Sequence, residues 1–132
     1  MQEQEQEKAF NKNSFNKRQI GTDHETVAAE YLEQKGYIIL ERNYRNPHGE
    51  IDIIAQDGET IVFCEIKYRK KGSCGSPLEA VDIRKQRRIS KVALYYTAGY
   101  KAPKNVFYRF DVIGIDGDGK IEHIENAFFF QR

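Results

Sequence analysis

A short polar turn between two apolar segments constrains the fold of this 132-residue chain more than any other feature. The segments are 51–55 and 60–66, and both are rich in the β-branched residues that favour strands. Asp57-Gly58 lies between them, and an Asp-Gly pair in this setting is typical of a two-residue hairpin turn. The sequence therefore predicts a β-hairpin, which needs further strands or a helix around it to be stable.

The hairpin predicts which side chains share a face. If Asp57 and Gly58 form the turn, Gln56 pairs with Glu59, and Glu50 then lies opposite Glu65 with Asp52 diagonal to it. One face carries Glu50, Asp52, Ile54, Ile61, Phe63, Glu65 and Lys67. The opposite face is purely apolar and is expected to be core: Ile51, Ile53, Ala55, Val62, Cys64 and Ile66.

Three carboxylates and a lysine gather on the first face at the end away from the turn. Like charges placed side by side destabilise a sheet, and a divalent cation would compensate them. Mg²⁺ is typically held by one or two carboxylates and keeps water or substrate oxygens in its other positions. Lys67 would orient an attacking water or stabilise charge on a phosphate. The alternative is a solvated Glu65–Lys67 ion pair, which contributes little, and the residues alone leave both interpretations open.

The remaining pattern predicts a single domain over 21–132, preceded by a polar, disordered tail over 1–20. Thr22 to Glu25 has capping-box spacing, so a helix is expected from Thr22 to a stop at Gly36. The other expected elements are a strand at 37–40, a loop at 46–49, a helix from Ser76 to about Ala98, and a hairpin of 106–115 and 120–128. The order α-β-β-β-α-β-β predicts an α/β (α+β) domain with a mixed sheet flanked by helices.

The distribution of charge is uneven although the net charge is only +1. Between Lys67 and Lys91 nine positive residues face two negative ones, which leaves +7 in this segment and −6 elsewhere. Such asymmetry indicates a surface that meets a polyanion, or alternatively a solvated helix face. Neither a secretory signal nor an apolar run of about 20 residues is present, and two cysteines are too few for a disulfide framework. A cytoplasmic protein with no membrane segment is expected.

Two motifs carry a resemblance to a known family. Gly49-Glu-Ile-Asp-Ile-Ile54, followed by Val62-Phe-Cys-Glu-Ile-Lys67 and Arg69, resembles the YraN family of small bacterial proteins. That family is assigned to the restriction-endonuclease-like, PD-(D/E)xK nuclease superfamily and is similar to archaeal Holliday junction resolvases. Further matches lie at Gly21 to Glu25, Asn43 to Arg45, Ala80-Val81, Lys85 and Arg109-Phe-Asp111.

The resemblance implies a restriction-endonuclease-like core and a function. Asp52 and Glu65 would bind Mg²⁺ or Mn²⁺, Lys67 would be the catalytic lysine, and Glu25 would complete the site, unless it serves only in the capping box. The implied activity is hydrolysis of DNA, including branched or junction DNA. A two-fold homodimer would suit this activity, because it can cut two strands symmetrically. The basic residues expected to contact DNA are Arg69, Lys70, Lys71, Lys85 and Arg88.

The chain also departs from the family pattern. Tyr68 stands where that pattern has threonine, Cys64 stands where it has valine, and Cys74 stands where it usually has an aromatic. The alternative to an enzyme is a binding module that retains a nuclease fold with weak or no hydrolysis. Near-neutral overall charge favours the binding module, and the intact Asp52, Glu65 and Lys67 favour the enzyme.

Overall fold

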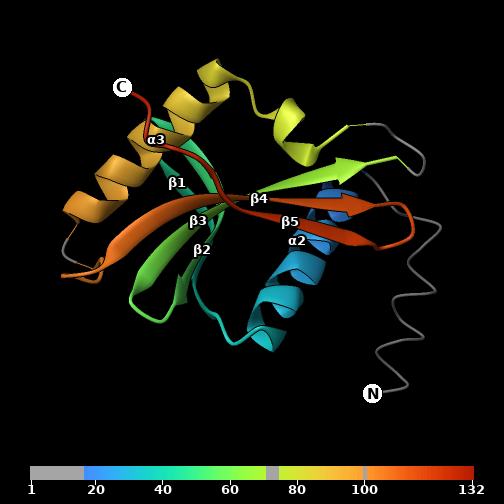
Figure 1. Ribbon diagram of the computed structural model, residues 1–132, viewed down its shortest axis with the longest axis horizontal. Coiled ribbons are helices and arrows are strands. Elements are labelled where there is room, and N and C mark those ends of the chain that lie inside the picture. The colour runs from blue at the N-terminus through green and yellow to red at the C-terminus, as the bar shows by residue number, and fades with distance from the viewer. Residues whose placement is uncertain (1–16, 71–74, 100) are drawn as a thin grey trace.

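The computed structural model describes residues 17–70, 75–99 and 101–132, with side chains from His24 onward. Figure 1 shows the elements in chain order: α2 (Lys17–Gln34), β1 (Ile38–Asn46), β2 (Gly49–Asp57), β3 (Thr60–Arg69), the short 3₁₀-helix η2 (Pro77–Ala80), α3 (Ile83–Ala98), β4 (Phe107–Asp116) and β5 (Ile121–Phe128). The predicted order α-β-β-β-α-β-β and the α+β class are confirmed.

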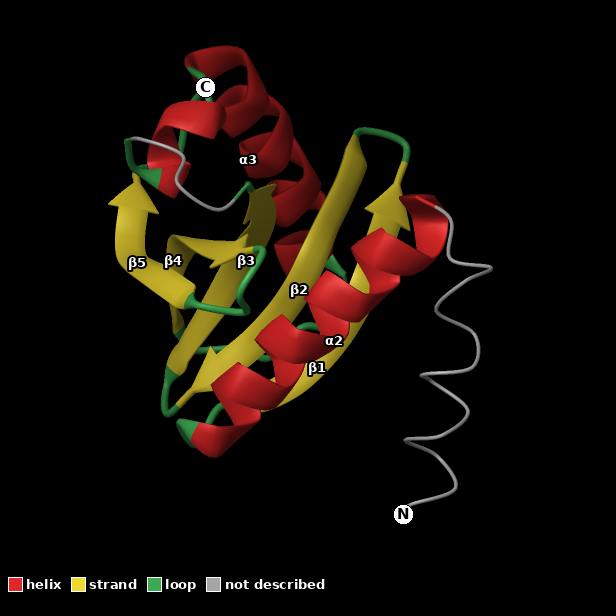
Figure 2. Cartoon of the chain, turned by 90° about the vertical axis from the view of Figure 1, so that its right-hand side faces the viewer, coloured by secondary structure: helices red, strands yellow, loops and turns green. Residues whose placement is uncertain are grey.

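The five strands form one mixed sheet in the order β1-β2-β3-β4-β5. β3 and β4 are parallel, and the other neighbours are antiparallel. The chain crosses from β3 to β4 through η2 and α3, which is the connection that a parallel pair requires. The two long helices cover opposite faces of the sheet, and Figure 2 shows α2 lying along β1 and β2. No helix in the described part of the chain is long and apolar enough to cross a membrane.

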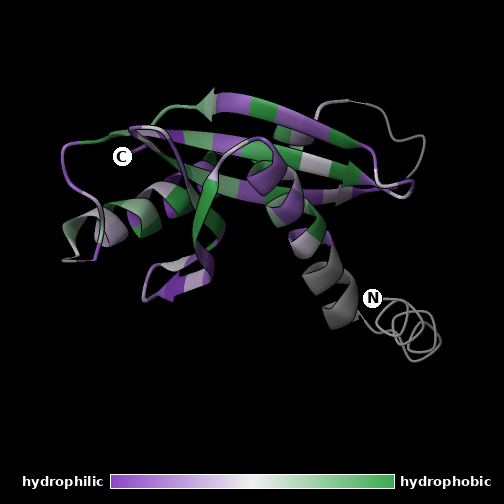
Figure 3. Ribbon diagram, turned by 90° about the horizontal axis from the view of Figure 1, so that it is seen from below, coloured by the Kyte–Doolittle hydropathy of each residue, from purple (hydrophilic) through white to green (hydrophobic). Residues whose placement is uncertain are grey.

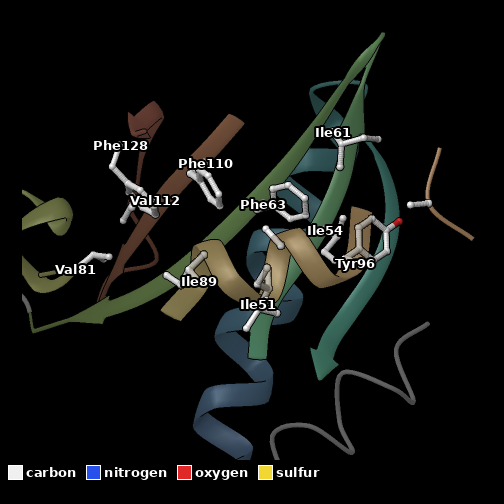
Figure 4. Packing of buried hydrophobic residues seen from close by; sticks show 13 residues of the cluster. Ile51, Ile54, Ile61, Phe63, Val81, Ile89, Tyr96, Phe110, Val112 and Phe128 are labelled. Atoms are coloured by element: carbon white, nitrogen blue, oxygen red, sulfur yellow. The ribbon is translucent and has the colours of Figure 1, made fainter. Parts of the chain in front are cut away.

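The core is divided by the sheet into two apolar clusters. The cluster on the α3 face includes Ile54, Ile61 and Phe63 from the hairpin, packed against α3 residues such as Ile89 and Tyr96 (Figure 4). The cluster on the α2 face joins Ala28, Ala29 and Leu32 to Ile53, Val62, Cys64 and Ile113. Figure 3 shows hydrophobic and hydrophilic residues mixed along α3 and along the coloured part of α2. This two-sided pattern is expected of helices that each bury one stripe.

Two predicted helix boundaries are wrong. α2 begins at Lys17 rather than Thr22, so the capping-box spacing at 22–25 lies inside the helix. The expected tail otherwise falls on residues 1–16, which lie outside the described part. The helix predicted from Ser76 to Ala98 is two elements: Ser76 caps η2, and Asp82 caps α3 by accepting the Lys85 N–H. Two capping signals six residues apart indicated the break, but the prediction used only the first.

The predicted turn of the hairpin is also wrong. Asp57 pairs with Thr60, so the turn residues are Gly58 and Glu59, and Ile54 faces Phe63 rather than Ile61. Gly58 has a φ of +60° at the first turn position, where glycine is preferred in type II′ turns. This register, continued along β2 and β3, places Asp52 opposite Glu65. Glu50 therefore does not lie opposite Glu65, and it instead accepts a 2.7 Å bond from Arg45.

The alternation of faces along β2 breaks at Asp52. Ile51 packs in the α3 cluster and Ile53 in the α2 cluster, although residues two apart on a regular strand share a face. The prediction that Ile51 lies with Ile53 is therefore wrong. The β2–β3 pairing also ends here, at Ile53 and Cys64. β2 is thus irregular at the residue that the sequence singled out.

Candidate active site

Asp52 lies where the β2–β3 pairing ends, and its side chain accepts a backbone N–H of β3 as a strand carbonyl would in a regular ladder. Its Oδ2 accepts the Ile66 N–H at 2.8 Å, although the regular ladder stops at the pair Ile53–Cys64. The carboxylate therefore bridges the gap that the irregularity of β2 opens. This contact fixes Asp52 against β3 next to Glu65 and Lys67, so the structure brings these three predicted residues together.

Glu65 is a buried carboxylate with another carboxylate beside it. Its exposed fraction is 8%, and the carboxylate of Asp52 lies close beside it. Burial and this neighbouring carboxylate together raise the pKa of Glu65 from 4.5 to about 8. Two carboxylates side by side repel each other when both are ionised. A cation placed between them would relieve this repulsion.

Two lysines neighbour this pair. Lys85, from the first turn of α3, places its Nζ 3.6 Å from Glu65 Oε2. Lys67 follows Glu65 by two residues on β3, and the two lysines are in contact with each other. Burial and the adjacent Lys85 lower the pKa of Lys67, against the attraction of Glu65. Lys85 keeps its charge more firmly: burial acts against it, but its contacts with Lys67, Glu65 and Asp52 raise its pKa.

Glu25 lies on α2 and is held by a different partner. Arg42 of β1 donates from Nε to Glu25 Oε1 at 3.1 Å and from its Nη2 to Thr26 Oγ1 at 2.9 Å. The exposed fraction of Glu25 is 6%, and burial raises its pKa, although Arg42 opposes this. Among the described residues, no three His, Cys, Asp or Glu side chains are grouped so as to hold a metal ion. The structure therefore brings Asp52 and Glu65 together, and leaves Glu25 on Arg42.

The basic residues expected to contact DNA occupy different environments. Lys85 belongs to the carboxylate cluster, Arg69 donates to the Gly75 carbonyl, and Lys70 is exposed. Arg88 is exposed on α3 and passes its aliphatic carbons over Gly49, where a Cβ would approach them to 3.3 Å. Lys71 lies outside the described residues. Lys85 thus belongs to the cluster, Lys70 follows the last residue of β3, and Arg88 lies about one turn beyond Lys85 on α3.

Two cavities of the described structure lie away from the carboxylates. One, of about 180 Å³, is lined by polar residues that include Arg69, Lys70 and Lys120. The larger, of about 360 Å³, is aromatic and lies between α3, β4 and the C-terminal residues, lined among others by Phe63, Tyr108 and Phe129. Asp52, Glu65 and Lys67 line neither of these two cavities.

Sequence reasoning missed three features of this region. It did not find that Arg42 holds Glu25, or that Lys85 contacts Glu65. It also passed over Tyr68, which stacks on His24 with ring centroids 4.2 Å apart and an interplanar angle of 13°. Each is a contact between distant segments, for which spacing along the chain carries no signal. Of the residues in these contacts that sequence reasoning missed, Lys85 had been named only as a match to the family pattern and as one of the basic residues expected to contact DNA.

The fold and this cluster define an α+β protein with paired carboxylates and lysines at the end of a mixed sheet. The model of the family described as uncharacterised protein family UPF0102 matches residues 24–115. A UPF0102 protein of Thermodesulfovibrio yellowstonii is 51% identical over 84% of this chain and 96% of its own length. Those of Caldicellulosiruptor saccharolyticus and Vibrio campbellii are each 46% identical, over 86% of this chain and 100% and 94% of their own lengths. The chain belongs to the UPF0102 (YraN) family, which confirms the resemblance.

Proposed function

We propose that this protein is a metal-dependent endonuclease that hydrolyses phosphodiester bonds in DNA. The observation that carries the proposal is the meeting of Asp52 and Glu65 beside Lys67 at the end of the β2–β3 pairing, where Asp52 Oδ2 accepts the Ile66 N–H at 2.8 Å. A buried carboxylate such as Glu65, with a raised pKa and another carboxylate beside it, is unfavourable for folding alone, and such groups concentrate at functional sites. The basic segment from Lys67 to Lys91 supplies charge for a DNA backbone.

The donor set of the cluster fits Mg²⁺ or Mn²⁺. Asp52 and Glu65 offer the one or two carboxylates by which Mg²⁺ is usually held, and the ion's other positions would take water and phosphate oxygens. A bound divalent cation would supply Lewis acidity and lower the pKa of an attacking water. Glu25 would join these ligands only by leaving Arg42, so its role in the site stays a prediction.

The lysines have distinct tasks in this proposal. Lys67, whose pKa is lowered by burial, sits beside the paired carboxylates and orients the attacking water or stabilises charge on the phosphate. Lys85 balances Glu65 in the absence of metal and contacts a neighbouring phosphate when metal takes over that charge. Lys70 and Arg88 neutralise flanking phosphates. Branched or junction DNA is the substrate class that the family resemblance favours, and a two-fold homodimer would cut two strands symmetrically.

Two variants and one control test the proposal. Lys67→Ala should lower cleavage by about 10²–10³-fold, because it removes a positioned cation from the reacting phosphate. The control is Lys91→Ala, which removes an exposed lysine from the same basic segment and should leave cleavage within about twofold, as expected for one phosphate contact among many. Cleavage is measured with Mg²⁺ and with Mn²⁺ on duplex, single-stranded, flap and four-way-junction DNA.

Metal-linked stability separates an enzyme from a binding module. At a Mg²⁺ concentration of 100 times its Kd, the wild type should gain about 2.7 kcal/mol in its free energy of unfolding. Asp52→Asn should gain nothing, because it removes one of the paired carboxylates. A wild type that shows neither this gain nor cleavage of any DNA form would favour the binding module. Metal-dependent stabilisation without cleavage would mean that the DNA forms tested do not include the substrate.

A further inference from the structure

Tyr68 and His24 form a stacked pair of rings at the edge of the candidate site. Their centroids are 4.2 Å apart, and their planes differ by 13°. Tyr68 is 50% exposed although one face of its ring is covered by the imidazole. It belongs to neither apolar cluster of the core. The packing of the fold therefore does not account for a large aromatic residue at this position.

The pair is tied to the site by its neighbours in the chain. Tyr68 follows Lys67 on β3, and His24 precedes Glu25 on α2. Successive side chains of a strand point to opposite faces, while consecutive Cα atoms lie only about 3.8 Å apart. The ring of Tyr68 therefore lies on the α2 face of the strand end whose α3 face carries Lys67. Because the two side chains flank the same end of β3, a strand bound at Lys67 would meet the ring where it passes round this end.

A second Tyr–His pair shows that exposure alone does not give this geometry. Tyr95 on α3 is 51% exposed and lies near His48, but their centroids are 5.9 Å apart and their planes differ by 63°. Such an edge contact presents no continuous stack. Tyr95 is also ten residues from Lys85 along α3, or about 15 Å. Two tyrosines with equal exposure thus differ in ring geometry and in distance from the carboxylates.

We propose that the Tyr68–His24 stack is a binding subsite for an unpaired nucleobase next to the phosphate held at Asp52, Glu65 and Lys67. The inference rests on the proposed nuclease function and narrows its substrate to DNA that contains single-stranded nucleotides. Aromatic rings bind single strands by stacking on base faces, and every base offers such a face. In a duplex these faces are covered by neighbouring base pairs, so the subsite distinguishes unpaired from paired DNA.

The test measures DNA affinity without metal, so that cleavage does not enter. The probes are a single strand carrying 2-aminopurine and a blunt duplex of the same sequence, titrated by fluorescence anisotropy. Tyr68→Thr keeps a strand-compatible side chain and removes the ring. It should weaken single-strand binding about tenfold or more, since stacking dominates such contacts, and change duplex binding less than about twofold. Tyr68→Phe should bind like the wild type, and the wild type should quench 2-aminopurine more than Tyr68→Thr does.

The matched control is Tyr95→Ala, which removes an equally exposed tyrosine and should leave both affinities unchanged. Urea unfolding checks that Tyr68→Thr remains folded. An equal loss of single-strand and duplex affinity, or a loss in Tyr68→Phe as large as in Tyr68→Thr, would overturn the subsite while leaving the nuclease proposal in place. A wild type that binds neither probe would overturn the subsite, and the nuclease proposal would still be decided by metal-linked stability and cleavage. Binding by the wild type with no effect of Tyr68→Thr overturns the subsite alone.

Discussion

Two buried carboxylates on adjacent parallel strands, Asp111 of β4 and Glu65 of β3, have opposite environments. Their exposed fractions are 0% and 8%, so both are removed from water. Asp111 lies on the α2 side of the sheet, where its strand neighbour is Cys64, and Glu65 contacts Lys85 on the α3 side. The pKa of Asp111 is lowered and that of Glu65 is raised to about 8. Burial raises the pKa of both carboxylates, so the difference between their pKa shifts comes from the groups around them.

Asp111 is surrounded by donors. Its Oδ1 accepts from Arg109 Nε at 3.0 Å and from the Asn126 N–H at 2.9 Å. Its Oδ2 bonds to His123 Nε2 at 2.7 Å and accepts from Arg109 Nη2 at 3.2 Å. Burial raises the pKa of Asp111, but these bonds to His123, Arg109 and Asn126 outweigh it. Because Asn126 has a φ of +51° beside the register shift of β4 and β5, the carboxylate also holds an irregular pairing in place.

Glu65 has a carboxylate where Asp111 has donors. Its cations are Lys85, whose Nζ lies 3.6 Å from Glu65 Oε2, and Lys67, which lies near Lys85 and has a lowered pKa itself. The two lysines match the two carboxylates in number, but Glu65 has a carboxylate beside it where Asp111 has several donors. A buried carboxylate with a full set of donors stabilises a fold, whereas one held beside another carboxylate stores unfavourable energy, as functional sites do. This contrast indicates which of the two motifs serves structure and which serves chemistry.

The largest expected effect is on Asp111. Asp111→Asn keeps the size of the side chain and removes the charge that Arg109 and His123 face. Removing one partner of a buried ion pair costs about 3–5 kcal/mol. Because Arg109 keeps Asp57 at 3.4 Å and Glu125 at 3.9 Å, the free energy of unfolding should fall by the lower end of this range, about 3 kcal/mol, in urea titrations at pH 7. A loss below about 1 kcal/mol, the range of exposed ion pairs, would mean that Asp111 is no better compensated than Glu65.

Ionisation of Glu65 is expected to destabilise the fold, whereas ionisation of Asp111 stabilises it. Between pH 4.5 and about 8 the folded chain keeps a proton on Glu65 that the unfolded chain has lost. The free energy of unfolding therefore falls as pH rises through this window, and the full penalty is present above about pH 8. Asp111 acts the other way: its lowered pKa stabilises the fold above pH 3.8, and this stabilisation is lost as pH falls below that value.

Glu65→Gln removes the group that titrates. The variant should be more stable than the wild type by about 1–3 kcal/mol at pH 8.5, since one pKa unit corresponds to about 1.4 kcal/mol. At pH 4.5 the two proteins should differ little, because Glu65 is then protonated in the folded wild type. Urea unfolding at both pH values measures the difference. A stability gain that is equal at pH 4.5 and pH 8.5 would show that packing and not charge is responsible.

The sequence was sufficient to predict the elements and their order, because apolar periodicity and turn residues are local signals. It also selected Asp52, Glu65 and Lys67, which the structure does bring together. The register was wrong by two residues, since Asp57-Gly58 and Gly58-Glu59 both satisfy known turn preferences and only packing decides between them. The error happened to separate Asp52 from Glu65, so the observed pair is closer than the predicted one.

The environment of Asp111 could not be predicted from its motif. Arg109 and Asp111 lie two residues apart on one strand face, but His123, Asn126 and Tyr37 reach them from other elements. The irregularity of β2 at Asp52 has no sequence signal either, because Ile51 and Ile53 are equally apolar. Irregular backbone and contacts between distant segments are decided by the whole fold, whereas periodic patterns are decided locally.

The smallest expected effect concerns Lys85, the cation nearest to Glu65. Its side chain is 33% exposed and its Nζ lies 3.6 Å from Glu65 Oε2, so the pair is worth less than about 1 kcal/mol. Lys85→Gln should lower the metal-free stability by no more than that amount, with Lys91→Gln as the control from the exposed side of α3. If the proposed metal site is right, saturating Mg²⁺ should stabilise Lys85→Gln more than the wild type, because the metal no longer competes with an ammonium group for Glu65. Urea unfolding with and without Mg²⁺ measures both differences. An equal Mg²⁺ effect in the two proteins would mean that Lys85 does not stand in for the metal, and Lys67 would then be the lysine that compensates Glu65.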